Sequence, residues 1–257
     1  MIHDSLLTML PGINRAREYY LYDRNGTRYL DFYQNRGRAL LGHRPDGVSA
    51  LLKSEISKGV YSELPSREEE WAARELKRFF GGYVSIFRNI ESAMLKCTGG
   101  KVPKDLLTDP GNPGAEAVLW RPFFGTGTET ARYVFPVLPF PGAWFPQPVI
   151  SADSPPPPGD AVSPIQLRLI IKILDLLKNA LDREKELSVW WKRFDAPCWK
   201  RRGPYLIYRG KNEYKKMFSC FLENGILLNP REEASIIPGK CSEGDLDKFG
   251  RLCVETD

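Results

Sequence analysis

Apolar and polar positions divide the chain into two regular ends and an irregular middle. Near the amino end, aromatic residues and leucine predominate in 19–23 and 28–32, on either side of Asn25-Gly26. An Asn-Gly pair between two such runs is a strong signal for a β-hairpin. Over 46–58 the apolar positions recur at the spacing of one helix face, so the hairpin is predicted to lead into a helix.

A second helix is predicted over the segment that contains "WAARELKRFF". Ser66 and Glu69 precede it at the spacing of a capping box, and Gly81-Gly82 follow it, where glycine commonly ends a helix. The apolar run "YVSIF" (83–87) then predicts a buried strand.

The regular pattern is lost between 101 and 164. Ten of the 21 prolines lie within 136–164 and include the run 155–158. Because proline lacks the backbone donor that helices and central strands use, this tract is predicted to form neither. It is either an ordered polyproline-like segment or a loose linker. The aromatic content of "FPVLPFPGAWFP" favours a segment that packs.

Regularity returns at Ser163, where Pro164 and Gln166 complete a helix start with a capping box. Apolar residues on nearly every face predict a deeply buried helix that continues to about Leu187. The remaining elements are predicted as strands in "PYLIYRG", "ILLNP" and "ASIIPG", a helix capped by Asn212 and closed by Gly225, and a last helix capped by Ser242.

Composition narrows the class of protein. A chain of 257 residues that is 42% hydrophobic can bury one large core or two smaller ones. Its five cysteines have no C-x-x-C spacing and it has only two histidines, which argues against a zinc site and against disulfides. No apolar run approaches the ~18 residues of a membrane span, and no signal-peptide pattern is present. The sequence therefore predicts a cytoplasmic protein without a metal and without membrane contact.

Positive charge is concentrated in one segment. Between Arg183 and Lys216, eleven Lys and Arg residues stand against four Asp and Glu, whereas the whole chain has a formal net charge of +5. Tryptophans and tyrosines lie in the same segment, a combination that can bind single-stranded nucleic acid. Without an RNP or zinc-knuckle pattern, we prefer a solvated basic face over half-buried aromatics, and nucleic acid is not an expected partner.

The two ends of the chain carry motifs in a recognisable order. The hairpin has Tyr20-Leu21-Tyr22-Asp23, Gly26, Tyr29-Leu30-Asp31-Phe32 and then Gly42-His43. It resembles the "Y-L-x-D-x-x-G-x-x-Y-L-D-F" hairpin and "G-H" of class III PLP-dependent aminotransferases, especially the glutamate-1-semialdehyde aminomutase branch. It departs at Arg44-Pro45-Asp46, where the family has a His-Pro pair. Near the other end, "FLENGILLNP" and "CSEGDLDKF" are similar to the family's "L-L-x-x-G-V-x-x-x-P" and "H-(T/S)-x-x-D-(I/L)".

This resemblance implies an α/β protein that is like the PLP-dependent transferases of fold type I but truncated in its middle. We expect a small α+β domain built from both chain ends, residues 1–60 and 165–257. Residues 61–164 would be a reduced remnant of the large PLP-binding domain and would include the Pro-rich tract 136–164. Because both ends would share one domain, residues 19–32 are expected to pair with residues within 205–237.

The middle of the chain departs from the family at the cofactor phosphate. "YVSIFRNIESAMLK" lies where the family has "V-x-F-x-N-S-G-T-E-A-x-x-x-A", whose Ser-Gly-Thr binds the phosphate of PLP. Asn89 and Ala93 are kept, but Ile90-Glu91-Ser92 replace the Ser-Gly-Thr, and Glu91 would repel a phosphate. The family's motifs for the aspartate that faces the pyridine nitrogen and for the Schiff-base lysine are absent from the sequence.

Two segments of the middle are candidate cofactor sites. Lys101 in "TGGKVP" is the candidate catalytic lysine, but it precedes the point of truncation, and we prefer a surface lysine in a turn. Gly125, Thr126, Gly127 and Thr128 in "FFGTGTETARY" are candidates for an anion-binding nest that would hold a cofactor phosphate. The alternative there is a plain turn.

Three residues near the hairpin are further candidates. Arg36 and Arg38 flank Gly37 in the stretch that approaches the substrate in the family, so they are candidates for binding a carboxylate or phosphate. His43 could act as a general base, but by analogy with the family we prefer a structural role.

Two functions from different classes are consistent with these motifs. The preferred one is an aminotransferase-like protein that has lost PLP catalysis and acts as a structural or regulatory binding protein, without a cofactor. The alternative is a residual PLP-dependent or phosphate-dependent transferase of the aminotransferase/aminomutase class, with PLP as its cofactor.

The aromatic part of the Pro-rich tract suggests a partner. "VFPVLPFPGAWFP" carries Trp144 with Phe135, Phe140, Phe145 and Val134, and a truncated dimeric fold would expose such residues to water at a cost. We therefore expect these residues to form the interface of a homodimer or of a complex with a related full-length aminotransferase.

Overall fold

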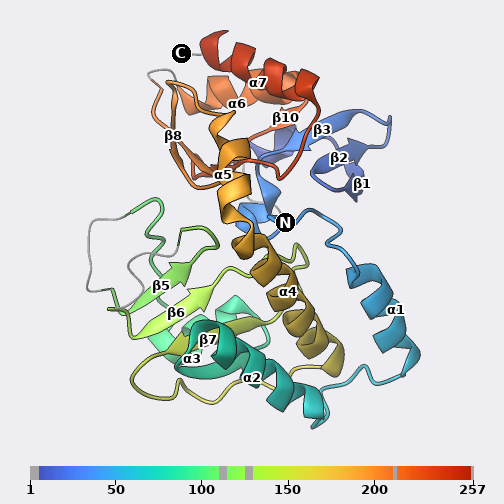
Figure 1. Cartoon of the computed structure of the whole chain (residues 1–257), viewed down its shortest axis with the longest axis vertical. Helices are drawn as coiled ribbons and strands as arrows, with labels where there is room; N and C mark the ends of the chain where they lie inside the picture. Colours follow the sequence, from blue (N-terminus) through green and yellow to red (C-terminus); the bar gives the residue numbers. More distant parts are fainter. Residues whose placement is uncertain (1–5, 110–114, 125–129, 211–212, 256–257) are drawn as a thin grey trace. The chain divides into compact units, whose positions relative to one another are not determined.

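The computed structural model describes residues 6–109, 115–124, 130–210 and 213–255. The chain divides into two compact units. The end unit contains Met1–Arg44 and Asp182–Asp257, and the middle unit contains Pro45–Leu181. Each unit has its own strands and helices, which Figure 1 colours from blue at the amino end to red at the carboxyl end.

The two ends of the chain meet in a four-stranded sheet of the end unit. Its strand order is β1-β2-β3-β10, with β1 (Ile13–Arg17), β2 (Tyr20–Asp23), β3 (Arg28–Asp31) and β10 (Ile226–Leu227). The strands β2 and β3 are antiparallel, which confirms the hairpin, and β3 pairs in parallel with β10. Figure 1 shows blue β3 beside orange β10, so the expected pairing of 19–32 with the far end of the chain is confirmed.

A second sheet and three helices complete the regular structure of the end unit. The sheet has the order β11-β9-β8, with β8 (Trp199–Arg202), β9 (Tyr205–Tyr208) and β11 (Ser235–Ile236). The helices are α5 (Glu184–Lys192), α6 (Tyr214–Glu223) and α7 (Glu243–Glu255), and the short 3-10 turns are η1 (Leu7–Met9) and η2 (Gln34–Gly37). The predicted cap Asn212 lies outside the described residues.

Aromatic side chains from both ends form the core of this unit. Phe32 at the end of β3 stacks on Phe249 of α7 with 5.0 Å between ring centroids. Phe194 meets both rings edge to face, at 5.8 and 5.4 Å. All three side chains are at most 1% exposed. Buried aromatic pairs stabilise a core beyond their area alone, so these contacts join the two chain ends.

The middle unit is a sheet between two helical layers. The strand order is β4-β7-β6-β5, with β4 (Tyr83–Phe87), β5 (Ala117–Trp120), β6 (Tyr133–Pro136) and β7 (Gln147–Ser151). The helices are α1 (Val48–Ser57), α2 (Arg67–Phe80), α3 (Ile90–Thr98) and α4 (Pro164–Asp182). Alternate residues of β4 face opposite layers, because Ile86 joins the apolar cluster of α2 and α4 whereas Phe87 joins that of α3. The two units together confirm the predicted α/β class.

The prediction that the Pro-rich tract forms no central strand is wrong. Strand β7 comes from this tract, lies between β4 and β6, and is buried at every position. A side chain supplies hydrogen bonds where the prolines cannot, since the Nε2 amide of Gln147 donates to the carbonyls of Pro136 at 3.0 Å and Pro148 at 2.8 Å. Pro148 lacks only a backbone donor, and its own carbonyl and that of Pro136 accept from the Gln147 amide. The strand can therefore include a proline.

The two predicted capping boxes have different outcomes. At α4 the Oε1 atom of Gln166 accepts from the Ser163 backbone N–H at 3.2 Å, as predicted. At α2 the predicted capping box is wrong, since the Ser66 side chain makes no capping hydrogen bond and its Oγ is buried without a partner. Helix α2 nevertheless begins at Arg67, with three glutamates in its first turn that complement the helix dipole.

The helix predicted to continue from Ser163 to about Leu187 is two helices. The first, α4, ends at Asp182, and α5 begins at Glu184. The compact units divide at this point, so α1 and α4 belong to the middle unit, whereas the family resemblance places 45–60 and 165–181 in the small domain. The assignment of the chain's middle to a remnant of a cofactor-binding domain remains a prediction.

Candidate functional site

The junction of β4 and α3 holds the segment that sequence analysis compared with a phosphate loop. Asn89 has an extended backbone there, and its Oδ1 accepts from the Ser92 N–H at 2.8 Å. This is an efficient helix N-cap. The first turn of α3 therefore presents the positive end of its dipole near the end of β4.

A carboxylate from the Pro-rich tract lies at this amino end of α3. The Oδ2 atom of Asp160 accepts from the Arg88 backbone N–H at 3.0 Å and from Ser92 Oγ at 2.5 Å. The Oδ1 atom accepts from Lys96 Nζ at 2.7 Å, and the Asp160 side chain is only 14% exposed. We call these four residues the Asp160 site.

These contacts determine the charge of the carboxylate. Burial by itself would raise the pKa of Asp160, but the hydrogen bonds from Lys96, Ser92 and the Arg88 backbone outweigh it and lower the pKa to about 2. Hydrogen bonds to the ionised form have this effect in general. Asp160 is therefore a fixed negative charge at neutral pH.

The backbone before Asp160 holds the tract against β4. The Asp160 N–H donates to the Ile86 carbonyl at 2.9 Å, and Lys96 Nζ donates to the carbonyls of Pro158 and Gly159 at 3.3 Å. A Cβ atom at Gly159 would lie 2.2 Å from the Ile86 oxygen, so only glycine permits this approach. Sequence reasoning missed Asp160, because a Gly-Asp pair after prolines indicates no more than a turn.

Lys101 lies apart from the Asp160 site. It follows the carboxyl end of α3, whereas Asp160 lies at the amino end, and a helix of this length spans about 13 Å. Its side chain is 81% exposed, and its Nζ is 4.0 Å from Glu116 Oε2. Lys101 therefore has the surroundings of a surface lysine. The other candidate cofactor residues, Gly125 to Thr128, lie outside the described residues.

The arginines proposed to bind substrate belong to the end unit. The Arg36 guanidinium forms a two-pronged pair with Glu233, with Nε–Oε2 at 2.8 Å and Nη2–Oε1 at 2.9 Å. The two donors with which an arginine binds a carboxylate are therefore already bound to Glu233. Arg38 follows Gly37 and is half-buried. Substrate binding by Arg36 or Arg38 remains a prediction.

His43 lies against a buried carboxylate. Its Nε2 atom is 2.8 Å from Oδ2 of Asp31, whose side chain is 1% exposed. The other carboxylate oxygen of Asp31 accepts from the N–H groups of Tyr33 at 2.8 Å and Gln34 at 2.9 Å. This network links the end of β3 to the loop that follows it, which supports the structural interpretation of His43.

Metal ligands and membrane spans were examined over the described part of the chain. It contains no group of three or more His, Cys, Asp or Glu side chains that could hold a metal ion. None of its helices is long and apolar enough to cross a bilayer.

Comparison with known proteins identifies the fold. No family model matches the chain. The solved structure of ornithine δ-aminotransferase from Plasmodium falciparum matches with a TM-score of 0.69 at 13% sequence identity, over 95% of this chain and 92% of that chain. This chain has the class III aminotransferase fold.

Two sequence relatives add to that finding. Glutamate-1-semialdehyde 2,1-aminomutase of Thermus thermophilus is 30% identical over 82 residues, which are 32% of this chain and 19% of the enzyme. This chain is thus much shorter than the aminomutase, in agreement with the predicted truncation. A protein of Borreliella burgdorferi described as uncharacterized is 29% identical over 265 residues, 96% of this chain and 92% of that protein.

The residues at the amino end of α3 do not fit a cofactor phosphate. In aminotransferases the corresponding motif supplies donors to the phosphate, but here Asp160 already accepts from Ser92, Lys96 and the Arg88 backbone. A phosphate would have to displace Asp160 or lie beside it, and like charges at such distances repel strongly. Glu91 in the first turn of α3 adds a further negative charge.

Proposed function

We propose that this aminotransferase-fold protein has lost PLP catalysis and acts as a structural or regulatory binding protein. The observation that carries the proposal is the position of Asp160. Its carboxylate takes the hydrogen bonds at the amino end of α3 that the family's motif gives to a phosphate. The exposed setting of Lys101 supports the same conclusion, because a Schiff-base lysine needs surroundings that make its amine nucleophilic.

The direct test is incubation of the purified protein with a stoichiometric amount of PLP. We expect no visible absorption band of a lysine–PLP Schiff base and no modified peptide after borohydride reduction. A band that disappears in Lys101→Ala would overturn the proposal and support the alternative, a residual PLP-dependent transferase. That alternative is favoured by the fold alone, since the neighbours of this chain in fold are PLP enzymes.

A second test asks whether Asp160 itself excludes the anion. Asp160→Ala removes the internal carboxylate but leaves the donors of Ser92, Lys96 and Arg88 in place. We expect this variant to bind inorganic phosphate in calorimetric titrations, whereas the wild-type protein does not. Asp153→Ala is the matched control, because Asp153 lies in the same tract and is exposed. If neither variant binds phosphate, the amino end of α3 is not a latent anion site and this support for the proposal is lost.

The partner proposal needs a different basis from the one that the sequence suggested. Phe135, Phe140 and Phe145 are at most 7% exposed and pack within the middle unit, so the aromatic tract is covered by its own chain, apart from Trp144 at 46% exposure. Four exposed apolar residues lie instead at the end of α1 and in the α1–α2 connection: Ile56, Val60, Tyr61 and Leu64.

We propose this connection as the contact of a homodimer, with a related full-length aminotransferase as the other possible partner. Large apolar patches on a protein surface are typical of interaction sites. Sedimentation at micromolar concentration should show a dimer that Tyr61→Ser with Leu64→Ser weakens. Sedimentation of the wild-type protein as a monomer would remove the homodimer and leave only the heteromeric form.

A further inference from the structure

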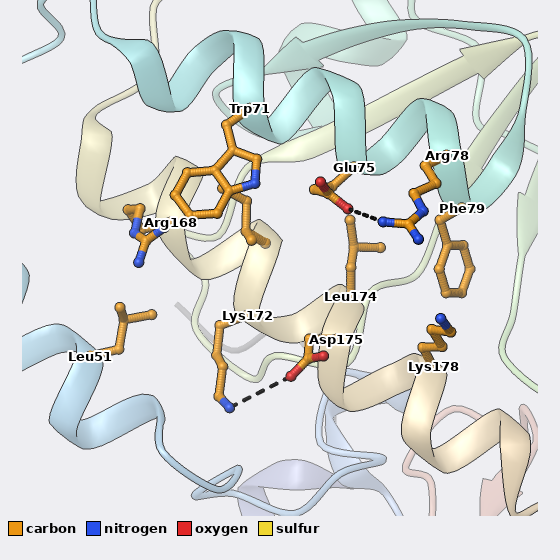
Figure 2. A pocket seen from close by; sticks show the side chains of 11 residues that line it. Leu51, Trp71, Glu75, Arg78, Phe79, Arg168, Lys172, Leu174, Asp175 and Lys178 are labelled. Carbon is orange, nitrogen blue, oxygen red and sulfur yellow. Dashed lines mark ion pairs between the residues drawn. The ribbon is translucent and has the colours of Figure 1, made fainter.

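A groove crosses the surface of the middle unit between α1, α2 and α4. Its volume is about 590 Å³, and Figure 2 shows the side chains that line it. Small-molecule sites typically have volumes of about 300–1,000 Å³, so the groove is large enough for an organic ligand. It shares no residue with the Asp160 site.

The base of the groove is apolar and partly aromatic. Trp71 and Phe79 come from α2, Leu51 from α1 and Leu174 from α4. Trp71 is 38% exposed, whereas tryptophan is highly buried on average. The Arg168 guanidinium lies 4.4 Å from the centroid of the Trp71 ring and holds the indole in place at one end.

The rim of the groove carries an excess of positive charge. Four basic residues, Arg78, Arg168, Lys172 and Lys178, line it together with two acidic ones, Glu75 and Asp175. In Figure 2 dashed lines join Arg78 to Glu75 and Lys172 to Asp175, and both pairs are 3.9 Å apart. Pairs at this separation are weak in water, so Arg78 and Lys172 can turn toward a ligand at little cost. Arg168 is held more firmly, because its Nε lies 3.5 Å from Oε1 of the buried Glu55.

We propose that this groove binds a small organic anion with an aromatic or other apolar body. The body would lie on Trp71, Phe79 and Leu174. The acidic head, a carboxylate, sulfonate or phosphate, would lie among the basic residues of the rim. The proposal rests on the pairing of an apolar base with net positive charge, since a bare anion would not use the base and a neutral ligand would not use the rim.

The groove deepens the proposed binding function by naming a ligand class, and it rests on that function. Its failure can be separated from failure of the PLP proposal, because no residue of the groove is a candidate cofactor residue. Binding at the groove and Schiff-base formation with PLP are measured with different probes.

A matched pair of fluorescent probes tests the proposal. 8-Anilinonaphthalene-1-sulfonate carries an aromatic body and a negative charge, whereas N-phenyl-1-naphthylamine is nearly the same body without the charge. We expect one molecule of the sulfonate to bind per chain, about tenfold more tightly than the neutral probe at low salt. Near-ultraviolet circular dichroism of the same samples must show fixed tertiary structure, since the sulfonate also binds partly folded states.

Variants assign the binding to the groove. The double substitution Arg78→Gln with Lys178→Gln should lower the affinity for the sulfonate about fivefold, because it alters only the charge of the rim. The affinity for the neutral probe should stay unchanged. Lys53→Gln with Lys77→Gln removes the same charge from exposed positions of α1 and α2 that do not line the groove, and should change neither affinity. Trp71→Ala should lower the affinity for both probes, because both use the apolar base of the groove.

Three outcomes would overturn the proposal. The two probes could bind equally well, the sulfonate could fail to bind, or the control pair could weaken the sulfonate as much as the rim pair does. In each case the groove would not select an organic anion.

Discussion

The two units of this protein differ in how closely their residues match the family's motifs. In the end unit, the aspartates that match the aminotransferase motifs are present and buried, and they hold the local structure together. In the middle unit, Ile90-Glu91-Ser92 differ from the motif with which this segment was compared, and an internal carboxylate lies at the same helix end. The motif residues of the end unit thus have structural contacts in the chain, whereas the segment of the middle unit departs from its motif.

The end unit shows this through Asp31 and Asp245. Asp31 accepts from two backbone N–H groups and lies 2.8 Å from His43 Nε2. Asp245, which matches the closing motif, accepts from Tyr20 at 3.0 Å, from Arg28 at 3.1 Å and from Ser242 Oγ at 2.6 Å. Both carboxylates join segments that are distant in sequence or tie down a loop, and neither role needs a cofactor.

The largest effect is expected at Asp31. Asp31→Ala removes the acceptor of the buried Gln34 N–H and the carboxylate partner of His43, whereas the Tyr33 N–H keeps the Leu227 carbonyl at 3.1 Å. The substitution should lower the free energy of unfolding by about 3 kcal/mol. Urea unfolding measures this change. Asp247→Ala, an exposed aspartate of α7, is the control and should cost less than about 0.5 kcal/mol. Equal effects of the two substitutions would show that Asp31 does not hold the end unit together.

A somewhat smaller effect is expected at Asp245. Burial would raise the pKa of this carboxyl, but hydrogen bonds from Ser242 and Tyr20 and the charge of Arg28 lower it. Asp245→Asn should destabilise the protein by about 2 kcal/mol at neutral pH, because charge-assisted hydrogen bonds are lost. The difference between wild type and variant should shrink as the pH falls below the usual pKa of aspartate. A constant difference down to that range would contradict the charged role.

The middle unit has a comparable carboxylate, Asp160, at the amino end of α3. Asp160→Asn should cost about 1–2 kcal/mol at neutral pH, since the amide cannot replace the ion pair with Lys96. The pKa of Asp160 is lowered from 3.8 to about 2, so the folded state gains stability above about pH 4 and loses it as the pH falls from 4 to 2. Chemical unfolding of both proteins across this window measures the loss. If the difference in free energy of unfolding between wild type and variant grows as the pH falls, the pKa of Asp160 is not lowered by folding.

The smallest effect is expected at Lys101. An exposed lysine 4.0 Å from Glu116 contributes little, so Lys101→Ala should change the free energy of unfolding by less than about 0.5 kcal/mol. Thermal unfolding with and without PLP measures both stability and any ligand effect. If PLP stabilises the wild type and Lys101→Ala abolishes this effect, Lys101 binds the cofactor. The middle unit would then keep a cofactor residue, and the contrast between the two units would be lost.

Local signals predicted the elements that depend on neighbouring residues. The Asn25-Gly26 hairpin, the Ser163–Gln166 start of α4 and the Ser242 cap of α7 all rest on hydrogen bonds within a few positions. The Ser66 capping box had the same signal and failed, because the side chain is buried where it finds no partner. Short-range patterns therefore predict element starts well when the side chain remains free to turn back on the helix.

The long-range contacts within the middle unit were the part that the sequence could not supply, whereas the pairing of the two chain ends followed from the family resemblance. The bonds from Ser92 and Arg88 to Asp160 join residues 68 and 72 positions apart. Strand β7 likewise depends on the amide of Gln147 reaching Pro136 across the sheet. Nothing in the local composition of a Pro-rich tract indicates which distant donors it will meet, so both the central strand and the candidate site were missed.

The internal carboxylate has a consequence for how stability responds to the surroundings of the protein. A protein that binds a free ligand gains stability with the logarithm of the ligand's concentration, and loses it when the ligand is scarce. Asp160 is attached to the chain, so its local concentration at the amino end of α3 is fixed by the backbone that packs against β4 at Gly159 and cannot be diluted. The middle unit therefore carries its own counter-ion for the donors at this helix end.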